Sequence, residues 1–172
     1  MKPRLVGVTS VVLLLTFGAD LDACGDKSLA AGGVRHQRAL AARYPASIVA
    51  YVPAASRLPA AARELKLQEK LRQYGHRYHE VASLSELHTS IAARGANIVL
   101  ADVADASGLQ RELTSSAAGV VLVPVAHKMG KAETRELSKQ WRFTIKAPSR
   151  ETEYLTTIAE AVKSRGDALR KS

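Results

Sequence analysis

Ionisable side chains follow three apolar runs in the second half of the chain, and parallel strands would bring such positions to one edge of a sheet. The four candidates are Asp102, His127, Lys128 and Lys146. A carboxylate can act as a nucleophile, and cations stabilise negative charge that develops during a reaction. No base–nucleophile pair can be placed from spacing alone. An enzyme that uses Asp102 with Lys146 or His127 is therefore only one of the alternatives.

The same residues also have structural interpretations. Asp102 could cap the turn that follows it, and Asp105 could cap the next helix. Lys146 could form a structural ion pair with Asp102 across neighbouring strand ends. A small-anion site is a further alternative, since Lys128, Lys131 and Lys146 can converge near strand ends, where helix N-termini also favour negative charge.

Motifs for metals and cofactors are absent from the sequence. The five histidines lack a metal-ligand spacing. Gly32-Gly33 lacks the spacing of a phosphate-binding loop, and Ser56 has no nucleophile-elbow glycines around it. We therefore expect neither a metal nor a cofactor.

The composition is that of a globular domain, with 172 residues, of which 47% are hydrophobic and 24% charged. The net charge of +9 favours nucleic acid, anionic lipid or an acidic partner. Alternatively it serves only solubility, because the basic residues are dispersed. Aromatic residues make up 5% of the chain, which gives little support for stacking on single-stranded nucleic acid. We expect no nucleic acid partner.

The N-terminus has the features of an export signal. Lys2 and Arg4 precede a largely apolar stretch, residues 5–17, which is shorter than the roughly 20 residues of a membrane span. The segment Leu21-Asp22-Ala23-Cys24 resembles a bacterial lipobox, although Asp22 departs from the usual small or apolar residue. This resemblance implies lipidation of Cys24, which is the only cysteine. The alternative is cleavage after Ala23 that leaves a free cysteine.

These features divide the chain into three parts. We expect a signal peptide at 1–23, a tether or irregular extension at 24–45, and a folded domain at 46–172. The protein would be exported to the bacterial cell envelope, either periplasmic or held at a membrane through lipidated Cys24.

Short apolar runs alternate with amphipathic segments through the folded part. The expected strands are Ser47–Val52, His76–Val81, Ile98–Ala101, Val120–Val123 and Phe143–Ile145. The expected helical faces are Leu67–Tyr74, Leu84–Ile91 behind a Ser83/Glu86 capping box, Ala106–Leu113, Lys131–Gln140 and Leu155–Val162. Regular pairing of the fourth strand should end near Pro124. This pattern predicts an α/β fold, with a three-layer, doubly wound, parallel five-stranded sheet in the flavodoxin-like order 2-1-3-4-5.

From Ser47 onward the chain resembles the receiver domain of bacterial response regulators. The segment Asn97–Asp102 is similar to the receiver strand that ends in the phosphoacceptor aspartate. The segment Phe143–Pro148 is similar to the one that carries the receiver's lysine, with Ala147 inserted between lysine and proline. The receiver's acidic pair is missing, because the first strand ends in Ala50-Tyr51-Val52-Pro53. The resemblance therefore implies a degenerate receiver without phosphorylation chemistry, and not an enzyme.

Two functions agree with these observations. The first is an exported, lipid-anchored, non-catalytic interaction module that binds a protein partner at the envelope. The alternative is a periplasmic binding protein for a small anion. The oligomeric state is left open.

Overall fold

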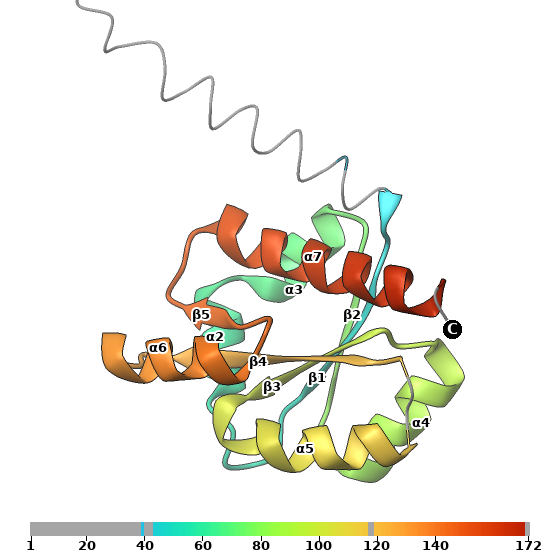
Figure 1. The fold of residues 1–172 in the computed structure, drawn as a ribbon, viewed down its shortest axis with the longest axis horizontal. Helices are drawn as coiled ribbons and strands as arrows, with labels where there is room; N and C mark the ends of the chain where they lie inside the picture. The colour runs from blue at the N-terminus through green and yellow to red at the C-terminus, as the bar shows by residue number, and fades with distance from the viewer. Residues whose placement is uncertain (1–38, 40–42, 117–118, 171–172) are drawn as a thin grey trace, which may run out of the picture.

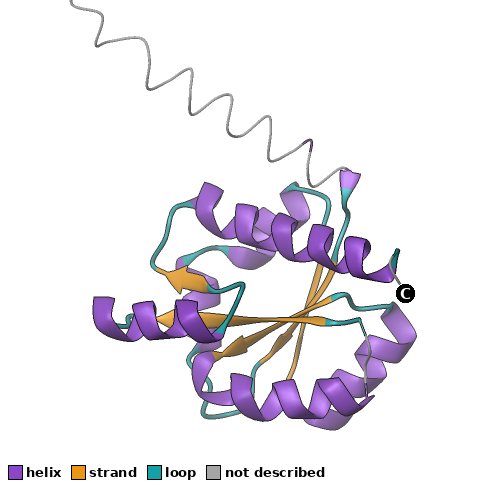
Figure 2. Cartoon of the chain, viewed as in Figure 1, coloured by secondary structure: helices purple, strands orange, loops and turns teal. Residues whose placement is uncertain are grey.

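Five parallel strands form the centre of the fold, and helices cover both faces of the sheet (Figures 1 and 2). The computed structural model describes residues 39, 43–116 and 119–170. The expected signal peptide and Cys24 lie outside these residues. The strands are β1 (Ser47–Tyr51), β2 (Arg77–Val81), β3 (Ile98–Asp102), β4 (Val121–His127) and β5 (Ile145–Ala147). Their spatial order is β2-β1-β3-β4-β5, which confirms the predicted flavodoxin-like fold.

The helices form the two outer layers of the fold. They are α2 (Leu58–Glu64), α3 (Leu67–Gln73), α4 (Leu84–Arg94), α5 (Val103–Ser116), α6 (Lys131–Gln140) and α7 (Glu151–Leu169). Helices α2, α3 and α7 pack on one face of the sheet, and α4 and α5 pack on the other. Helix α6 lies beside β4 and β5 on the side of α5 (Figure 1).

The core consists of two apolar layers, one on each face of the sheet. Strand β3 is buried along its whole length, as expected for the centre of a parallel sheet covered on both sides. Alternate residues of β1 contribute to different layers, with Ile48 and Ala50 on the α7 side and Val49 on the α5 side.

Strand β4 continues through Pro124, so the prediction that pairing ends there is wrong. Lys128 N donates to Ala147 O at 2.8 Å, which shows that even-numbered residues of β4 direct their nitrogen toward β5. Stepping back four residues along both strands from this bond places the Pro124 nitrogen opposite Phe143, which precedes β5. Proline therefore loses no ladder hydrogen bond at this position.

Three other elements differ from the sequence-based expectations. Strand β5 is shifted by two residues and includes Lys146, which the sequence had placed after the strand. Helix α2 was not predicted, and it ends where Lys66 takes a left-handed backbone conformation ahead of α3. Helix α5 begins at Val103 instead of Ala106. By contrast, the predicted Ser83 cap of α4 is present, with Ser83 Oγ accepting from Glu86 N at 3.2 Å. Glu86 Oε2 accepts from Ala82 N at 2.8 Å, one residue before the expected donor.

The first β-strand is held at its start by a buried histidine, which makes stability dependent on pH. His76 is 4% exposed, and its Nδ1 accepts a hydrogen bond from Ala46 N at 3.1 Å. Burial lowers the pKa of His76, and burial together with the charge of Arg94 lowers the pKa of His79. Both groups therefore stabilise the fold at a pH above the ordinary histidine pKa of about 6.5, and this stabilisation is lost as the pH falls below it.

We expect the free energy of unfolding to fall between pH 7.5 and pH 5, measured by urea denaturation. His76→Asn should flatten this slope, because the asparagine oxygen can still accept from Ala46 but does not titrate. A slope that is the same in His76→Asn as in the unmutated protein would show that His76 does not cause it.

Candidate functional site

Asp102 is the last residue of β3 and holds the beginnings of two helices. It is 7% exposed. Its Oδ1 accepts from Ala104 N at 3.0 Å, and its Oδ2 accepts from Arg57 N at 2.8 Å. Ala104 lies in the first turn of α5, and Arg57 directly precedes α2. The interpretation of Asp102 as a cap is therefore confirmed, and it extends to a second helix.

This arrangement occupies the place where doubly wound folds usually bind ligands. That place is the switch point beyond the carboxyl ends of the strands, here between β1 and β3. The loop after β1 is tied to Asp102 through Arg57, and Asp102 lines none of the five cavities described for the chain. Both carboxylate oxygens of Asp102 therefore accept hydrogen bonds from the chain's own backbone.

A second carboxylate lies close by in the first turn of α5. Asp105 is half-buried, and burial, followed by the negative charge of Asp102, raises its pKa. Asp105 does not cap α5 as the sequence suggested, because the helix begins two residues earlier and Asp102 takes that role.

Asp102 and Lys146 point to opposite faces of the sheet. The strand register pairs Asp102 with Val125 and Val125 with Ile145, whereas Lys146 pairs with Ala126. Paired residues of parallel strands share a face, and successive residues alternate between faces. The proposed ion pair between Asp102 and Lys146 is therefore wrong, and the structure does not bring these two residues together as one site.

His127 lies on the same face as Asp102 and has its own partner. Its Nε2 lies 3.0 Å from Glu64 Oε2 at the end of α2, and its side chain is 13% exposed. It pairs in the sheet with Ala147, one residue beyond Lys146, and so points away from the Lys146 side chain. Of the four candidates, only Lys128 and Lys146 line a common cavity.

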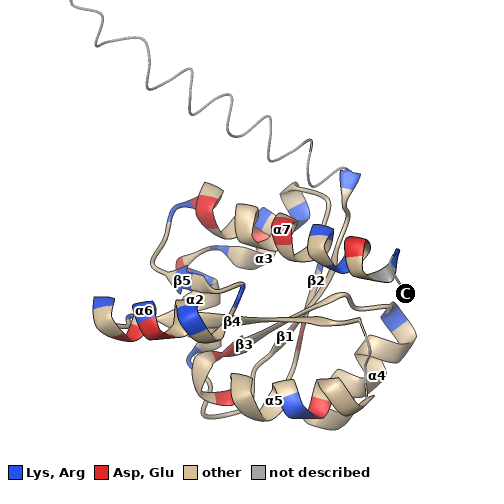
Figure 3. Cartoon of the chain, in the orientation of Figure 1, with Lys and Arg blue, Asp and Glu red and all other residues tan. Residues whose placement is uncertain are grey.

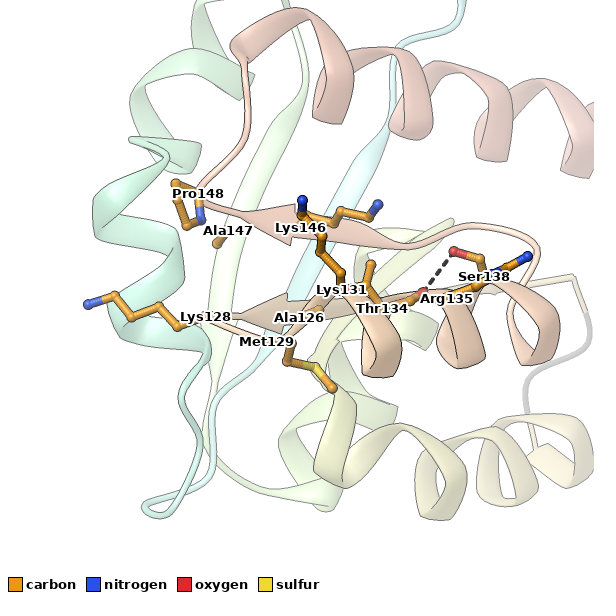
Figure 4. A pocket seen from close by; sticks show the side chains of 10 residues that line it. All are labelled: Ala126, Lys128, Met129, Lys131, Thr134, Arg135, Ser138, Lys146, Ala147 and Pro148. Atoms are coloured by element: carbon orange, nitrogen blue, oxygen red, sulfur yellow. Dashed lines mark hydrogen bonds between the residues drawn. The ribbon is translucent and has the colours of Figure 1, made fainter.

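That cavity is a groove of about 510 Å³ between α6 and the ends of β4 and β5 (Figure 4). Its basic residues are Lys128, Lys131, Arg135 and Lys146. Its remaining lining residues are Ala126, Met129, Thr134, Ser138, Ala147 and Pro148. Figure 4 shows the Lys131 and Lys146 side chains reaching toward the same end of the groove, while Lys128 extends outward on the opposite side. All three predicted lysines therefore line one groove, but only the Lys131 and Lys146 side chains approach each other there.

One face of α6 forms a wall of the groove. Lys131, Thr134, Arg135 and Ser138 all line it, and their spacing of three and four residues places them on a single helical face. At 1.5 Å per residue this wall is roughly 10 Å long. Arg135 was not among the sequence-based candidates, although its position four residues after Lys131 was the signal that could have found it.

The positive charge of the groove is not neutralised by ion pairs. Within the described residues, no salt bridge involves any of its four cations. The nearest acids in sequence have other partners. Glu133 Oε2 accepts from Gly130 N at 2.9 Å and so caps the start of α6, and Glu136 pairs with Lys139. Lysine and arginine elsewhere are spread over most elements, together with acidic residues (Figure 3). The groove is therefore a local concentration of uncompensated positive charge.

Lys128 adopts a backbone conformation that is unfavourable for a lysine. Its φ is 52°, in the left-handed region that favours glycine. A lysine held there costs about 1–2 kcal/mol relative to ordinary backbone. Non-glycine residues in this region are often found at functional sites.

No protein-family model matches the chain, and no curated protein matches it. In the part of the chain that the structure describes, no helix is both long and apolar enough to cross a bilayer. The same residues contain no group of three or more His, Cys, Asp or Glu side chains arranged to hold a metal ion.

Proposed function

We propose that this domain is a non-catalytic binding module that takes an elongated anionic ligand in the groove between α6 and β5. The observation that carries the proposal is a single groove lined by four cations, none of them in an ion pair with a described residue. Cations without a partner repel one another, and an anion bound between them relieves this repulsion.

The shape of the groove favours a ligand with several charges along its length. Lys131 and Arg135 are one helical turn apart on the same wall, and Lys146 belongs to β5 on the other side. A single compact anion would contact only part of this set. All four cations are exposed, so the ligand would bind partly hydrated and its affinity would fall as salt rises.

The position of Asp102 supports a non-catalytic role. Its two oxygens accept hydrogen bonds from backbone N–H groups, and its side chain points away from the groove cations. A carboxylate held in this way stabilises the fold. Covalent phosphorylation at Asp102 would disrupt both caps.

Isothermal titration with inorganic tripolyphosphate, pyrophosphate and phosphate tests the proposal. We expect tripolyphosphate to bind most tightly. Its dissociation constant should rise between about 50 and 300 mM salt, because salt screens the attraction between exposed charges. A ligand at a hundredfold its dissociation constant should also add about 2.7 kcal/mol of stability. The absence of binding by all three anions at low salt would refute an anion site.

Replacing Lys128 by glycine should change stability and binding in opposite directions. Glycine adopts the left-handed region without strain, so Lys128→Gly should stabilise the fold by roughly 0.5–1.5 kcal/mol. The lost charge should weaken tripolyphosphate binding severalfold. Chemical denaturation and titration of the same preparation measure both effects.

Lys66→Gly is the matched control for this prediction. Lys66 also has a left-handed backbone, with φ of 50°, but it lies between α2 and α3 outside the groove. It should give the gain in stability without the loss of binding. Equal binding of tripolyphosphate by the unmutated protein and Lys128→Gly would show that Lys128 does not contribute to the site.

We also propose that the domain works at the bacterial envelope, held there by lipidated Cys24. The support is the signal-like N-terminus and the lipobox resemblance of Leu21-Asp22-Ala23-Cys24. Intact mass of protein extracted from membranes, beside a Cys24→Ser variant, tests this. A mature mass without acyl chains in the unmutated protein would exclude the anchor.

A further inference from the structure

We propose that the ligand of the groove is an extended acidic segment of a partner protein, which adds to the open edge of β5 as a sixth strand. This inference rests on the proposed function and specifies its ligand. It follows from the position of β5, which is the last strand of the sheet and lies between α6 and α7 (Figure 1).

The backbone of β5 presents one donor and one acceptor on its open side. Ala147 O accepts from Lys128 N, so Ala147 directs its backbone groups toward β4. Successive residues of a strand direct theirs to opposite sides, so the Lys146 N–H and C=O point away from the sheet. Among the described residues, Lys146 has no strand partner on that side. An added strand would pair with these two groups.

Polar groups without partners also lie on the other side of this edge. Thr144 Oγ1 and Ser149 Oγ are buried atoms with no hydrogen-bond partner among the described residues. Both line a smaller cavity of about 210 Å³ between β5 and α7. Thr144 directly precedes β5 and Ser149 follows it by two residues, so unpaired polar groups flank the strand as well as its open middle.

The two cavities match the alternation of an extended chain. Successive side chains of a strand point to opposite faces. Acidic side chains at every second position would therefore reach the basic groove beside α6, and the intervening side chains would lie over the hydroxyl-lined cavity beside α7. The groove wall of roughly 10 Å corresponds to about three residues of an extended chain.

The charge of the groove indicates that its ligand is a separate protein and not the chain's own N-terminal extension. The chain's own extension at 24–45 carries Lys27, Arg35, Arg38 and Arg43 against a single acid, Asp26. It has the same sign of charge as the groove. A segment rich in aspartate or glutamate is complementary to it.

An eight-residue peptide that alternates Glu and Thr is the probe, with tripolyphosphate as the comparison. Hydrogen exchange at the Lys146 amide should slow when the peptide binds and should not slow when tripolyphosphate binds. If the peptide binds without slowing exchange at Lys146, strand addition is wrong. If tripolyphosphate binds and the peptide does not, the inference fails and the proposed function stands. If neither binds, both fail.

Two substitutions at one position separate the backbone from the charge. Lys146→Ala removes the charge and keeps the N–H, while Lys146→Pro removes both, at an edge position where proline is tolerated. We expect Lys146→Pro to bind the peptide about fivefold to tenfold more weakly than Lys146→Ala, the effect of one hydrogen bond. Both variants should bind tripolyphosphate equally. Equal binding of the peptide by the two variants would overturn the inference.

Discussion

Asp102→Ala should destabilise the fold by roughly 2–4 kcal/mol, measured as the free energy of unfolding in urea. The alanine removes the acceptor for two backbone N–H groups at once, those of Arg57 and Ala104. Hydrogen bonds to a charged acceptor each contribute about 1.5–3 kcal/mol, and a donor left unsatisfied near the core costs a similar amount. The loop after β1 and the start of α5 should both loosen.

Asp105→Asn is the matched control, because it removes a carboxylate three residues away, in the first turn of α5. Burial and the charge of Asp102 raise the pKa of Asp105, so its ionised form is a cost to the folded state at neutral pH. Asp105→Asn should therefore stabilise the protein slightly at pH 7, and this gain should disappear as the pH falls below the ordinary aspartate pKa of about 3.9. A stability for Asp102→Ala equal to that of the unmutated protein would contradict the capping role.

The double variant Lys131→Glu/Lys146→Glu should weaken tripolyphosphate binding by about thirtyfold or more. Two groove cations become anions, so attraction is lost and repulsion is added on both walls. Both residues are exposed, so the fold should tolerate the change. Titration calorimetry at 50 mM salt measures the effect, and the difference from the unmutated protein should shrink at high salt.

Lys66→Glu/Lys163→Glu changes the net charge by the same amount outside the groove. Both of these lysines are exposed, on the opposite side of the sheet from α6. This control should retain most of the binding. If both double variants lose affinity equally, the anion responds to overall charge and the groove has no special role.

The sheet order could be predicted because each strand is a short apolar run and each connection a single amphipathic segment. Strand β3 and helix α6 were placed well, since burial and helical periodicity are local properties. The expected end of pairing at Pro124 was wrong because the effect of this proline depends on where β5 begins, which the sequence does not reveal. Helix α2 was missed because it is only one part of a two-helix connection that turns at Lys66.

The candidate site could be predicted only in part, because contacts and register between distant segments are not local properties of the sequence. The placement of Lys128, Lys131 and Lys146 around one groove follows from the topology, since all three lie in or next to the neighbouring elements β4, α6 and β5. The hydrogen bond from Arg57 N to Asp102 joins residues 45 positions apart, and no sequence pattern predicts it. The grouping of Asp102 with Lys146 failed because it requires the register between β4 and β5, and a shift of one residue reverses the face.

The most direct test of the account is a map of amide chemical shifts on titration with tripolyphosphate. The account predicts that the shifts gather at residues 128–135 and 145–147, on both walls of the groove. The loop at 53–57 and the turn at 102–105 should change little, because Asp102 is engaged there with the chain's own backbone. Shifts concentrated at those two segments, and absent from the groove, would place the ligand at the switch point and contradict the account.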